Sequence, residues 1–338
     1  MGVATASRVL RGDPQPLIGV KTRERVLDAA RRLKYRHNLQ ARQLRTGRSE
    51  VVGILAWGLS GGVNLARYQA VERAIRAGGY RALMGHAAGD EELRLQLAKE
   101  FASSAVEGVI VLNTGGAHDA AVQVLVERGV PIVSMEPLEG LSADVVTVDR
   151  RAGAHLVTKH LLELGHRRIA FLCGKLTVPA NAERFQGYRE ALGEHGCSPD
   201  EALLVRIARS DTWGHYGQGY EAGQRLLAVR PLPTAVFCNN DEVAIGAMRS
   251  LGEAGIRIPE DVAMAGFDDA EAAAYAPVPL TTLAQPVQEQ AARAVSLLFE
   301  RIAKPDEERQ PHAIRLTPRL VVRASCGAAA GRKRICEH

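Results

Sequence analysis

Two clusters of side chains are of types that bind metals or carry out acid–base chemistry. His155 and His160 lie on one predicted helix, but their spacing of five residues differs from the i, i+4 spacing of a helical metal-binding pair. Asp268, Asp269 and Glu271 could together bind a cation, although a carboxylate-rich loop is more often a turn or a helix cap. Neither cluster therefore predicts a metal site or a catalytic centre.

The sequence lacks the common motifs of nucleotide-binding proteins and of ester and peptide hydrolases. It contains no G-x-G-x-x-G, no G-x-x-x-x-G-K-[ST], no G-x-S-x-G and no H-E-x-x-H. Gly58, Gly61 and Gly62 follow a predicted strand, but they lack the spacing of a dinucleotide-binding loop. We therefore expect no enzymatic activity, no cofactor and no metal.

The positive charge of the chain is concentrated at its N-terminus. Residues 1–50 contain twelve Lys and Arg residues against four acidic residues, whereas the whole chain of 338 residues has a net charge of only +5. The head is therefore strongly basic and the remaining body slightly acidic. This distribution is typical of a protein that binds a polyanion at one end, although a solvated basic helix would look the same.

Composition and cysteine usage indicate a soluble protein in a reducing compartment. No apolar run approaches the ~20 residues of a membrane span, and the N-terminus lacks the apolar core of a secretory signal. The five cysteines form no C-x-x-C pair, so neither a disulfide framework nor a cysteine-rich zinc site is expected. We therefore predict a cytoplasmic protein.

The basic head has the pattern of short helices. A stretch from Ala4 to Leu10 is compatible with a helix and ends before Gly12. A second helix is predicted from Val20 to Leu33, with one apolar face formed by Val26, Leu27, Ala30 and Leu33. A short basic segment at residues 38–45 then leads through Thr46-Gly47 into the body.

Strands and helices alternate throughout the body, which predicts parallel sheets covered by helices on both faces. The predicted strands are 51–56, 80–85, 107–112, 130–134, 144–148, 168–173, 202–207, 234–238 and 262–266. The predicted helices are 64–78, 91–104, 117–129, 151–164, 181–195, 215–229 and 241–254.

The alternating pattern falls into two series, so we expect two doubly wound α/β lobes that face each other across a cleft. The first lobe is predicted at about 50–148 and 279–310, and the second at about 149–278 and 311–327. Residues 1–37 form the head, 38–49 a linker, and 328–338 a small polar tail.

Motifs in the right order over nearly the whole chain resemble the LacI/GalR family of bacterial transcriptional regulators. In the head, Met1 to Leu10 is similar to the family's recognition helix, usually V-S-x-x-T-V-S-R-V-L, and Ala41 to Arg45 is similar to its hinge helix. In the body the matching segments are Val148-Asp149, residues 160–169, Arg184-Phe185-Gln186-Gly187-Tyr188, Asn240 to Ala244, Gly266 to Asp269 and Leu280 to Pro286. The resemblance implies a two-lobed fold like that of periplasmic binding proteins, carrying a helix-turn-helix head.

The resemblance also shows a departure at the N-terminus. In the family a helix and a turn precede the recognition helix, whereas here Met1 already falls on that turn. The first helix of the helix-turn-helix is thus missing from this sequence. Because a recognition helix without its scaffold helix would bury little surface, we expect the natural start to lie upstream of Met1; the alternative is a natural truncation.

The resemblance assigns DNA contacts to several head residues. A recognition helix places its N-terminal residues in the major groove, where Val3 and Ala4 could touch a thymine methyl group but could equally be helix filler. Polar side chains at the other matching positions suit hydrogen bonds to phosphates or base edges. These are Thr5, Ser7, Arg8, Thr22, Arg23, Asn38 and Arg42.

Leu44 stands among Arg42, Gln43 and Arg45 with no evident core to join. In the family the matching leucines of two subunits enter the minor groove at the operator centre and kink the DNA. Apolar wedges of this kind exchange base stacking for a bent duplex with more contacts. The alternative is that Leu44 packs against its twin or against the body.

The resemblance places effector-binding residues in the cleft. Arg184 and Asp241 match family positions that contact effectors, although a salt bridge and a helix N-cap are the respective structural alternatives. Asn64 begins a segment that is usually N-P-F-F but here reads N-L-A-R, so the usual aromatic residue is lost. Glu136 follows a strand as a further acceptor, and Trp213 could stack on a sugar ring.

The sequence therefore predicts a homodimeric transcriptional regulator, most simply a repressor, that binds palindromic operator DNA and a small-molecule effector such as a sugar. Closure of the cleft would change the spacing of the two hinges and hence DNA binding. The alternatives are a periplasmic-type sugar-binding protein and a ligand-binding regulator remnant without specific DNA binding.

Overall fold

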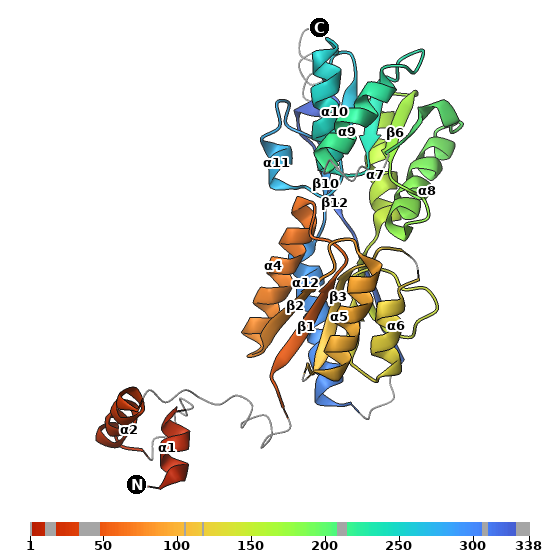
Figure 1. The fold of residues 1–338 in the computed structure, drawn as a ribbon. Coiled ribbons are helices and arrows are strands. Elements are labelled where there is room, and N and C mark those ends of the chain that lie inside the picture. The colour runs from red at the N-terminus through yellow and green to blue at the C-terminus, as the bar shows by residue number, and fades with distance from the viewer. Residues whose placement is uncertain are drawn as a thin grey trace. The chain divides into compact units, whose positions relative to one another are not determined.

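The computed structural model describes residues 2–10, 18–33, 48–104, 106–116, 118–207, 215–305 and 310–328. The chain divides into a small N-terminal unit, Met1–Ser49, and a large unit, Glu50–His338 (Figure 1). Each unit is described by itself. Among the described helices, none is long and apolar enough to cross a bilayer.

The N-terminal unit contains α1 (Val3–Leu10) and α2 (Val20–Arg32), as predicted. The two helices contact each other, and Val9 and Val26 are the two apolar side chains buried in the described part of this unit. The predicted apolar face of α2 is wrong in part, because Leu27 is 41% and Leu33 79% exposed. Two short helices cover only a narrow strip of each other, so the outer apolar positions stay in solvent.

The first lobe of the large unit is built on a six-stranded parallel sheet with the order β11-β5-β4-β3-β1-β2. Helices α4 and α12 cover one face and α5 and α6 the other (Figure 1). Neighbouring strand residues point to opposite faces, so Ile54 packs under α4 and α12 while Leu55 packs under α5 and α6. The elements are β1 (Val51–Ala56), α4 (Gly62–Ala77), β2 (Arg81–His86), α5 (Glu91–Ser103), β3 (Gly108–Asn113), α6 (Ala120–Glu127), β4 (Ile132–Ser134), β5 (Asp144–Val148), α12 (Val287–Ala303) and β11 (Ala313–Leu316).

The second lobe has a four-stranded parallel sheet with the order β7-β6-β8-β9. Helices α7 and α8 pack on one face around Phe171 and Phe237, whose stacked rings lie 4.8 Å apart, and α9 and α10 pack on the other face. The elements are α7 (Arg150–Glu163), β6 (Ile169–Cys173), α8 (Pro179–Glu194), the 3-10 turn η1 (Glu201–Leu203), β7 (Leu204–Arg206), α9 (His215–Leu226), β8 (Ala235–Cys238), α10 (Asp241–Glu253) and β9 (Ala263–Ala265).

Several helices begin at an Asp or Asn side chain that accepts a backbone N–H of the first turn. Asp90, Asp119, Asp149 and Asn240 cap α5, α6, α7 and α10 in this way, over distances of 2.9 to 3.2 Å. Each cap satisfies a donor that the helix itself cannot pair. These caps fix the residue at which each helix begins after its strand, at the carboxyl edge of the sheet that faces the other lobe.

Three segments of the described chain connect the lobes. β5 leads into α7, β10 (Thr282–Ala284) leads from the second lobe into α12, and β11 leads into β12 (Arg319–Val321), which pairs antiparallel with β10. The short helices α11 (Glu271–Ala274) and η2 (Ala324–Cys326) complete this region. The sequence assigned residues 311–327 to the second lobe, but β11 pairs with β5 in the first sheet, so the chain returns only after Leu316.

Candidate functional site

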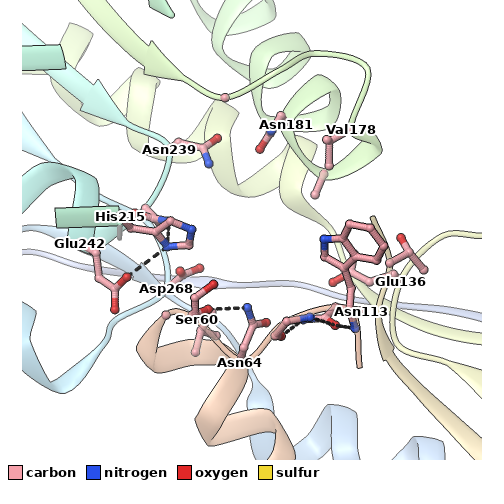
Figure 2. A pocket seen from close by; sticks show the side chains of 18 of the residues that line it. Ser60, Asn64, Asn113, Glu136, Val178, Asn181, His215, Asn239, Glu242 and Asp268 are labelled. Atoms are coloured by element: carbon pink, nitrogen blue, oxygen red, sulfur yellow. Dashed lines mark hydrogen bonds and ion pairs between the residues drawn. The ribbon is translucent and has the colours of Figure 1, made fainter. Parts of the chain in front are cut away.

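A cavity of about 850 Å³ lies between the two lobes of the large unit (Figure 2). Its walls come from the carboxyl ends of strands in both sheets, including Trp57 after β1, Asn113 at the end of β3, Lys175 after β6 and Asn239 after β8. Ligands of doubly wound sheets bind at this edge, so the cavity lies where the sequence predicted it. Its volume is within the usual range of ~300–1,000 Å³ for small-molecule sites.

The charges lining the cavity balance. Four cationic side chains, Arg67, Arg150, Lys175 and Arg184, stand against four carboxylates. The carboxylates are Glu136, Asp241, Glu242 and Asp268. A site with paired charges of both signs offers donors and acceptors without a net field, which suits a neutral polar ligand better than an anion.

Glu136 is buried between two guanidinium groups. Its Oε1 accepts hydrogen bonds from Arg67 Nη1 at 2.8 Å and from Arg150 Nη2 at 2.6 Å. Arg67 also donates from Nη2 to Gln285 Oε1 at 2.6 Å. Burial lowers the pKa of Arg67, and the neighbouring Glu136 carboxylate opposes that shift. Glu136 lines the cavity as predicted. Because its Oε1 already accepts hydrogen bonds from Arg67 and Arg150, the main role of Glu136 is to pair these two buried cations.

Arg184 and Asp268 meet on the cavity wall. Arg184 is 6% exposed, and its guanidinium lies 4.3 Å above the Phe267 ring and 3.8 Å from Asp268 Oδ1. Burial lowers the pKa of Arg184 to about 10, while Asp268 acts in the opposite direction, so Arg184 stays charged at neutral pH. The predicted effector role and the predicted salt bridge are therefore compatible, because the pair itself faces the cavity.

Asp268 is a site residue that sequence reasoning missed, because the acidic run was assigned to a turn. A turn is indeed present, since Asp268 and Asp269 have φ of +120° and +55°, a region that non-glycine residues rarely adopt. Strained backbone of this kind is found at functional sites. Burial raises the pKa of Asp268, and Arg184 and Arg67 oppose this shift.

Asp241 lies in the cavity wall, but its carboxylate faces the protein. Oδ1 accepts from the Thr282 hydroxyl at 2.5 Å and Oδ2 from the Ala270 amide at 2.7 Å, and the residue is 1% exposed. Burial, reinforced by the charge of Asp268, raises its pKa. The helix cap considered as an alternative is provided by Asn240 instead. Asp241 is therefore a positioning residue that fastens α10 to β10.

Amide side chains complete the cavity. Asn64 in α4 donates to the Ser60 carbonyl at 2.9 Å, and Figure 2 shows both residues on the first-lobe wall. Asn239 and Asn181 lie on the opposite wall, and Asn239 Oδ1 is buried without a partner among the described residues. An unpaired buried acceptor indicates a place for a ligand donor.

A hydrogen bond between α10 and α4 joins the lobes directly across the cleft. Glu242 in α10 accepts from the backbone N–H of Gly62, the first residue of α4, at 3.0 Å, and its other oxygen lies 3.1 Å from His215 Nδ1. The structure therefore shows the lobes linked at this point. His155 and His160, the pair considered as metal ligands, have separate partners in Glu194 and Cys326.

The predicted DNA-contacting residues fall in part within the described head. Val3, Ala4, Thr5, Ser7 and Arg8 lie on α1, where Thr5 is partly exposed and Arg8 is exposed. The side chains of Val3, Ala4 and Ser7 lie outside the described part. Thr22 and Arg23 lie in the first turn of α2, where their amides donate to the Gly19 carbonyl. Asn38, Arg42, Leu44 and Trp213 lie outside the described residues.

Replacing Glu136 tests the network that it holds. Glu136→Gln removes the carboxylate that Arg67 and Arg150 share and leaves Arg150 only the more distant Glu183, at 3.7 Å, so we expect the free energy of unfolding to fall by about 3 kcal/mol. Urea unfolding of the whole chain measures this loss. Glu139→Gln, at an exposed position three residues later, is the matched control and should change little. Equal effects of the two substitutions would contradict the role given to Glu136.

Comparison with known proteins agrees with this architecture. Residues 158–326 match the family model of the periplasmic binding protein-like domain. The transcriptional repressor PurR of Haemophilus influenzae (strain PittEE) is 30% identical over 305 residues, 90% of this chain and 89% of that protein. PurR of Erwinia tasmaniensis is 32% identical over 310 residues, 90% and 88% of the two chains.

Solved structures give the same result. The transcriptional regulator CelR in complex with cellobiose superposes with a TM-score of 0.74 at 30% identity, covering 96% of both chains. A putative LacI-family regulator from Sanguibacter keddieii has a TM-score of 0.74 at 33% identity, covering 83% of this chain and all of the other. The predicted fold and family are thereby confirmed: the chain belongs to the LacI/GalR family and is a DNA-binding transcriptional regulator controlled by a small-molecule effector.

Proposed function

We propose that the protein is a repressor whose effector is a carbohydrate bound in the cleft between the lobes. The observation that carries this proposal is the charge-balanced, amide-rich lining of the cavity. Each sugar hydroxyl both donates and accepts, so it needs acceptors such as Asp268 and Asn239 next to donors such as Arg184. The regulator CelR, 30% identical, forms a complex with cellobiose, which supports a saccharide of similar size.

Arg184 and Asp268 are the proposed anchors of the ligand, with Asn64 and Asn239 as further contacts and Asp241 and Glu136 behind them. Arg184 presents a forked donor whose orientation is fixed by Phe267 and by a hydrogen bond to the Ala180 carbonyl at 3.2 Å. Held side chains lose little entropy when a ligand binds, so the site is pre-organised.

Asp268→Asn tests the carbohydrate site. The substitution keeps the shape of the residue and its tolerance of positive φ but removes the charged acceptor, so we expect saccharide affinity to fall about tenfold or more. Isothermal titration with cellobiose, maltose and lactose measures the change. Asp269→Asn is the matched control, because Asp269 shares the strained turn but pairs with Arg323 at 2.6 Å outside the cavity. Unchanged saccharide affinity in Asp268→Asn would refute the anchor role.

We propose that DNA is bound by the head and the linker. By family resemblance α1 enters the major groove with Val3, Ala4, Thr5, Ser7 and Arg8, while Thr22, Arg23, Asn38 and Arg42 contact phosphates or base edges. Leu44 is the proposed minor-groove wedge. The positive charge of residues 1–50 supports this end of the chain as the DNA-binding end.

Leu44→Ala tests the wedge. The substitution should weaken binding to a selected palindrome by about tenfold or more while leaving non-specific binding and the salt dependence unchanged, because no charge is lost. Fluorescence anisotropy at two salt concentrations measures both quantities. Arg42→Ala is the contrasting variant and should weaken both kinds of binding and reduce the salt slope. A wild-type chain that selects no palindrome would instead identify a regulator remnant without specific DNA binding.

The effector is proposed to act by changing the closure of the lobes. Glu242 and Gly62 join the two lobes across the cleft, and the first lobe starts at β1, directly after the linker in sequence. A saccharide that touches both lobes stabilises one degree of closure over another. A difference of about 1–3 kcal/mol in the free energy of effector binding to the two states is enough for regulation.

The outer face of α9 and α10 is proposed as the homodimer surface. An apolar groove of about 1,140 Å³ runs over these helices, lined by Ile245, Met248, Ile256, Ile258 and the 45%-exposed Tyr216 among others. The proposed occupant is a second copy of the chain, because a palindromic operator presents two identical half-sites and calls for a two-fold symmetric protein.

Ile245→Asp tests the dimer surface. In a two-fold interface each substitution occurs twice, so two buried carboxylates should convert the dimer to a monomer. Sedimentation velocity of the full chain measures the mass. Leu156→Asp is the matched control, because Leu156 is a 38%-exposed apolar residue of α7 on the other face of the same lobe. Dissociation by both variants, or by neither, would rule out this surface.

A further inference from the structure

One aromatic side chain borders the cavity and is not used by the contacts described above. Trp57 follows β1 directly and is partly exposed. Among the described residues that line the cavity, it is the single Trp, Tyr or Phe.

The backbone of Trp57 is held on both sides. Its amide donates to Asn113 Oδ1 at 2.8 Å, and its carbonyl accepts from the Gly89 amide at 2.8 Å. Asn113 in turn donates from Nδ2 to the Gly58 carbonyl at 2.7 Å. The Asn113 amide group is thus committed to fixing this loop, and the position of Trp57 is set by β2, β3 and the loops that follow them.

The indole ring packs against a glycine. A Cβ built on Gly115 would lie 2.8 Å from Cδ2 and Cε2 and 2.9 Å from Cε3 of Trp57. Cδ2 and Cε2 form the bond shared by the two rings, so nearly equal distances to these atoms place Gly115 over the middle of one ring face. Any side chain at position 115 would displace the ring, which leaves glycine as the residue that fits.

We propose that Trp57 is the stacking platform of the effector site and selects ligands with a flat apolar face, namely the C–H face of a pyranose ring. One indole face is covered by Gly115, and Trp57 is a partly exposed residue of the cavity lining. Apolar side chains such as Leu59, Val178 and Ile207 also line the cavity, but among the described lining residues Trp57 alone offers the flat apolar ring on which the face of a sugar can stack. This inference rests on the proposed carbohydrate effector and adds a specificity-determining residue to that site.

Three substitutions separate stacking from general structure. Trp57→Leu keeps an apolar side chain but removes the flat ring, whereas Trp57→Phe keeps a smaller aromatic ring. Trp213→Phe keeps an aromatic ring at a position that the resemblance assigns to the effector site, and it leaves Trp57 as the sole indole of the chain, so that the fluorescence reports on Trp57 alone. Circular dichroism and thermal unfolding establish that each variant is folded before ligand is added.

Titration calorimetry with cellobiose, maltose and lactose measures saccharide affinity, and the fluorescence of Trp213→Phe reports on Trp57 directly. We expect Trp57→Leu to weaken binding of the saccharide that the wild type prefers by about tenfold, Trp57→Phe to remain within about threefold, and Trp57 emission to shift on binding. Adenine, a planar base that any aromatic platform could stack, is titrated in parallel.

The outcomes distinguish the stacking role of Trp57 from the carbohydrate effector on which it rests. A wild-type chain that binds saccharide while Trp57→Leu binds it equally well overturns the platform and leaves the carbohydrate site intact. A wild-type chain that binds none of the saccharides, with or without binding adenine, overturns the carbohydrate effector and this inference together. Loss of binding in Trp57→Leu with retention in Trp57→Phe supports both.

Discussion

The shared hydrogen bonds of Glu136 with Arg67 and Arg150 are the interaction on which the cleft depends. Each of the three side chains is nearly inaccessible to solvent, and a buried charge is tolerated only when it is paired. Through Gln285 the network reaches the connecting segment after β10, and Gln285 also donates to Asp268. Arg67 lies in α4 of the first lobe and Arg150 in α7 of the second, so both helices are held by the same carboxylate.

This network also explains how the binding wall is oriented. Arg184 and Asp268 stand next to it, and Asp241 holds Thr282 and Ala270 behind them. Gly266 has no side chain because a Cβ there would lie 2.2 Å from Asp241 Oδ1. The side chains that line the cavity are thus supported by a second layer of buried polar contacts, which holds them in place. A regulator needs this combination, because rigid walls convert ligand binding into a change of lobe closure rather than local rearrangement.

The balance of charge in the cavity connects the site to its ligand class. A net positive cavity would attract phosphates, and a net negative cavity would attract amines or metal ions. Cationic side chains share the lining with acidic ones, of which Asp241 turns its carboxylate toward the protein, and the amides of Asn64 and Asn239 add further donors and acceptors. Trp57 adds the apolar surface. The basic head differs from the cavity in carrying an excess of positive charge, which favours binding to the DNA backbone.

The sequence by itself determined the alternation of strands and helices, the basic head, the position of the cleft and the family, because these follow from local periodicity, charge and short motifs. The family resemblance predicted Arg184, Asp241 and Asn64 at the cleft, and Glu136 was predicted there because it follows a strand; all four line the cavity. Tertiary structure decided what the side chains do there. Asp241 and Asp268 lie in two acidic segments far apart in sequence, and only the fold turned one toward buried partners and the other toward the cavity. Trp57 acquired its place through Gly115 and Asn113, and β11 joined the first sheet, because contacts between distant segments leave no local signal in the sequence.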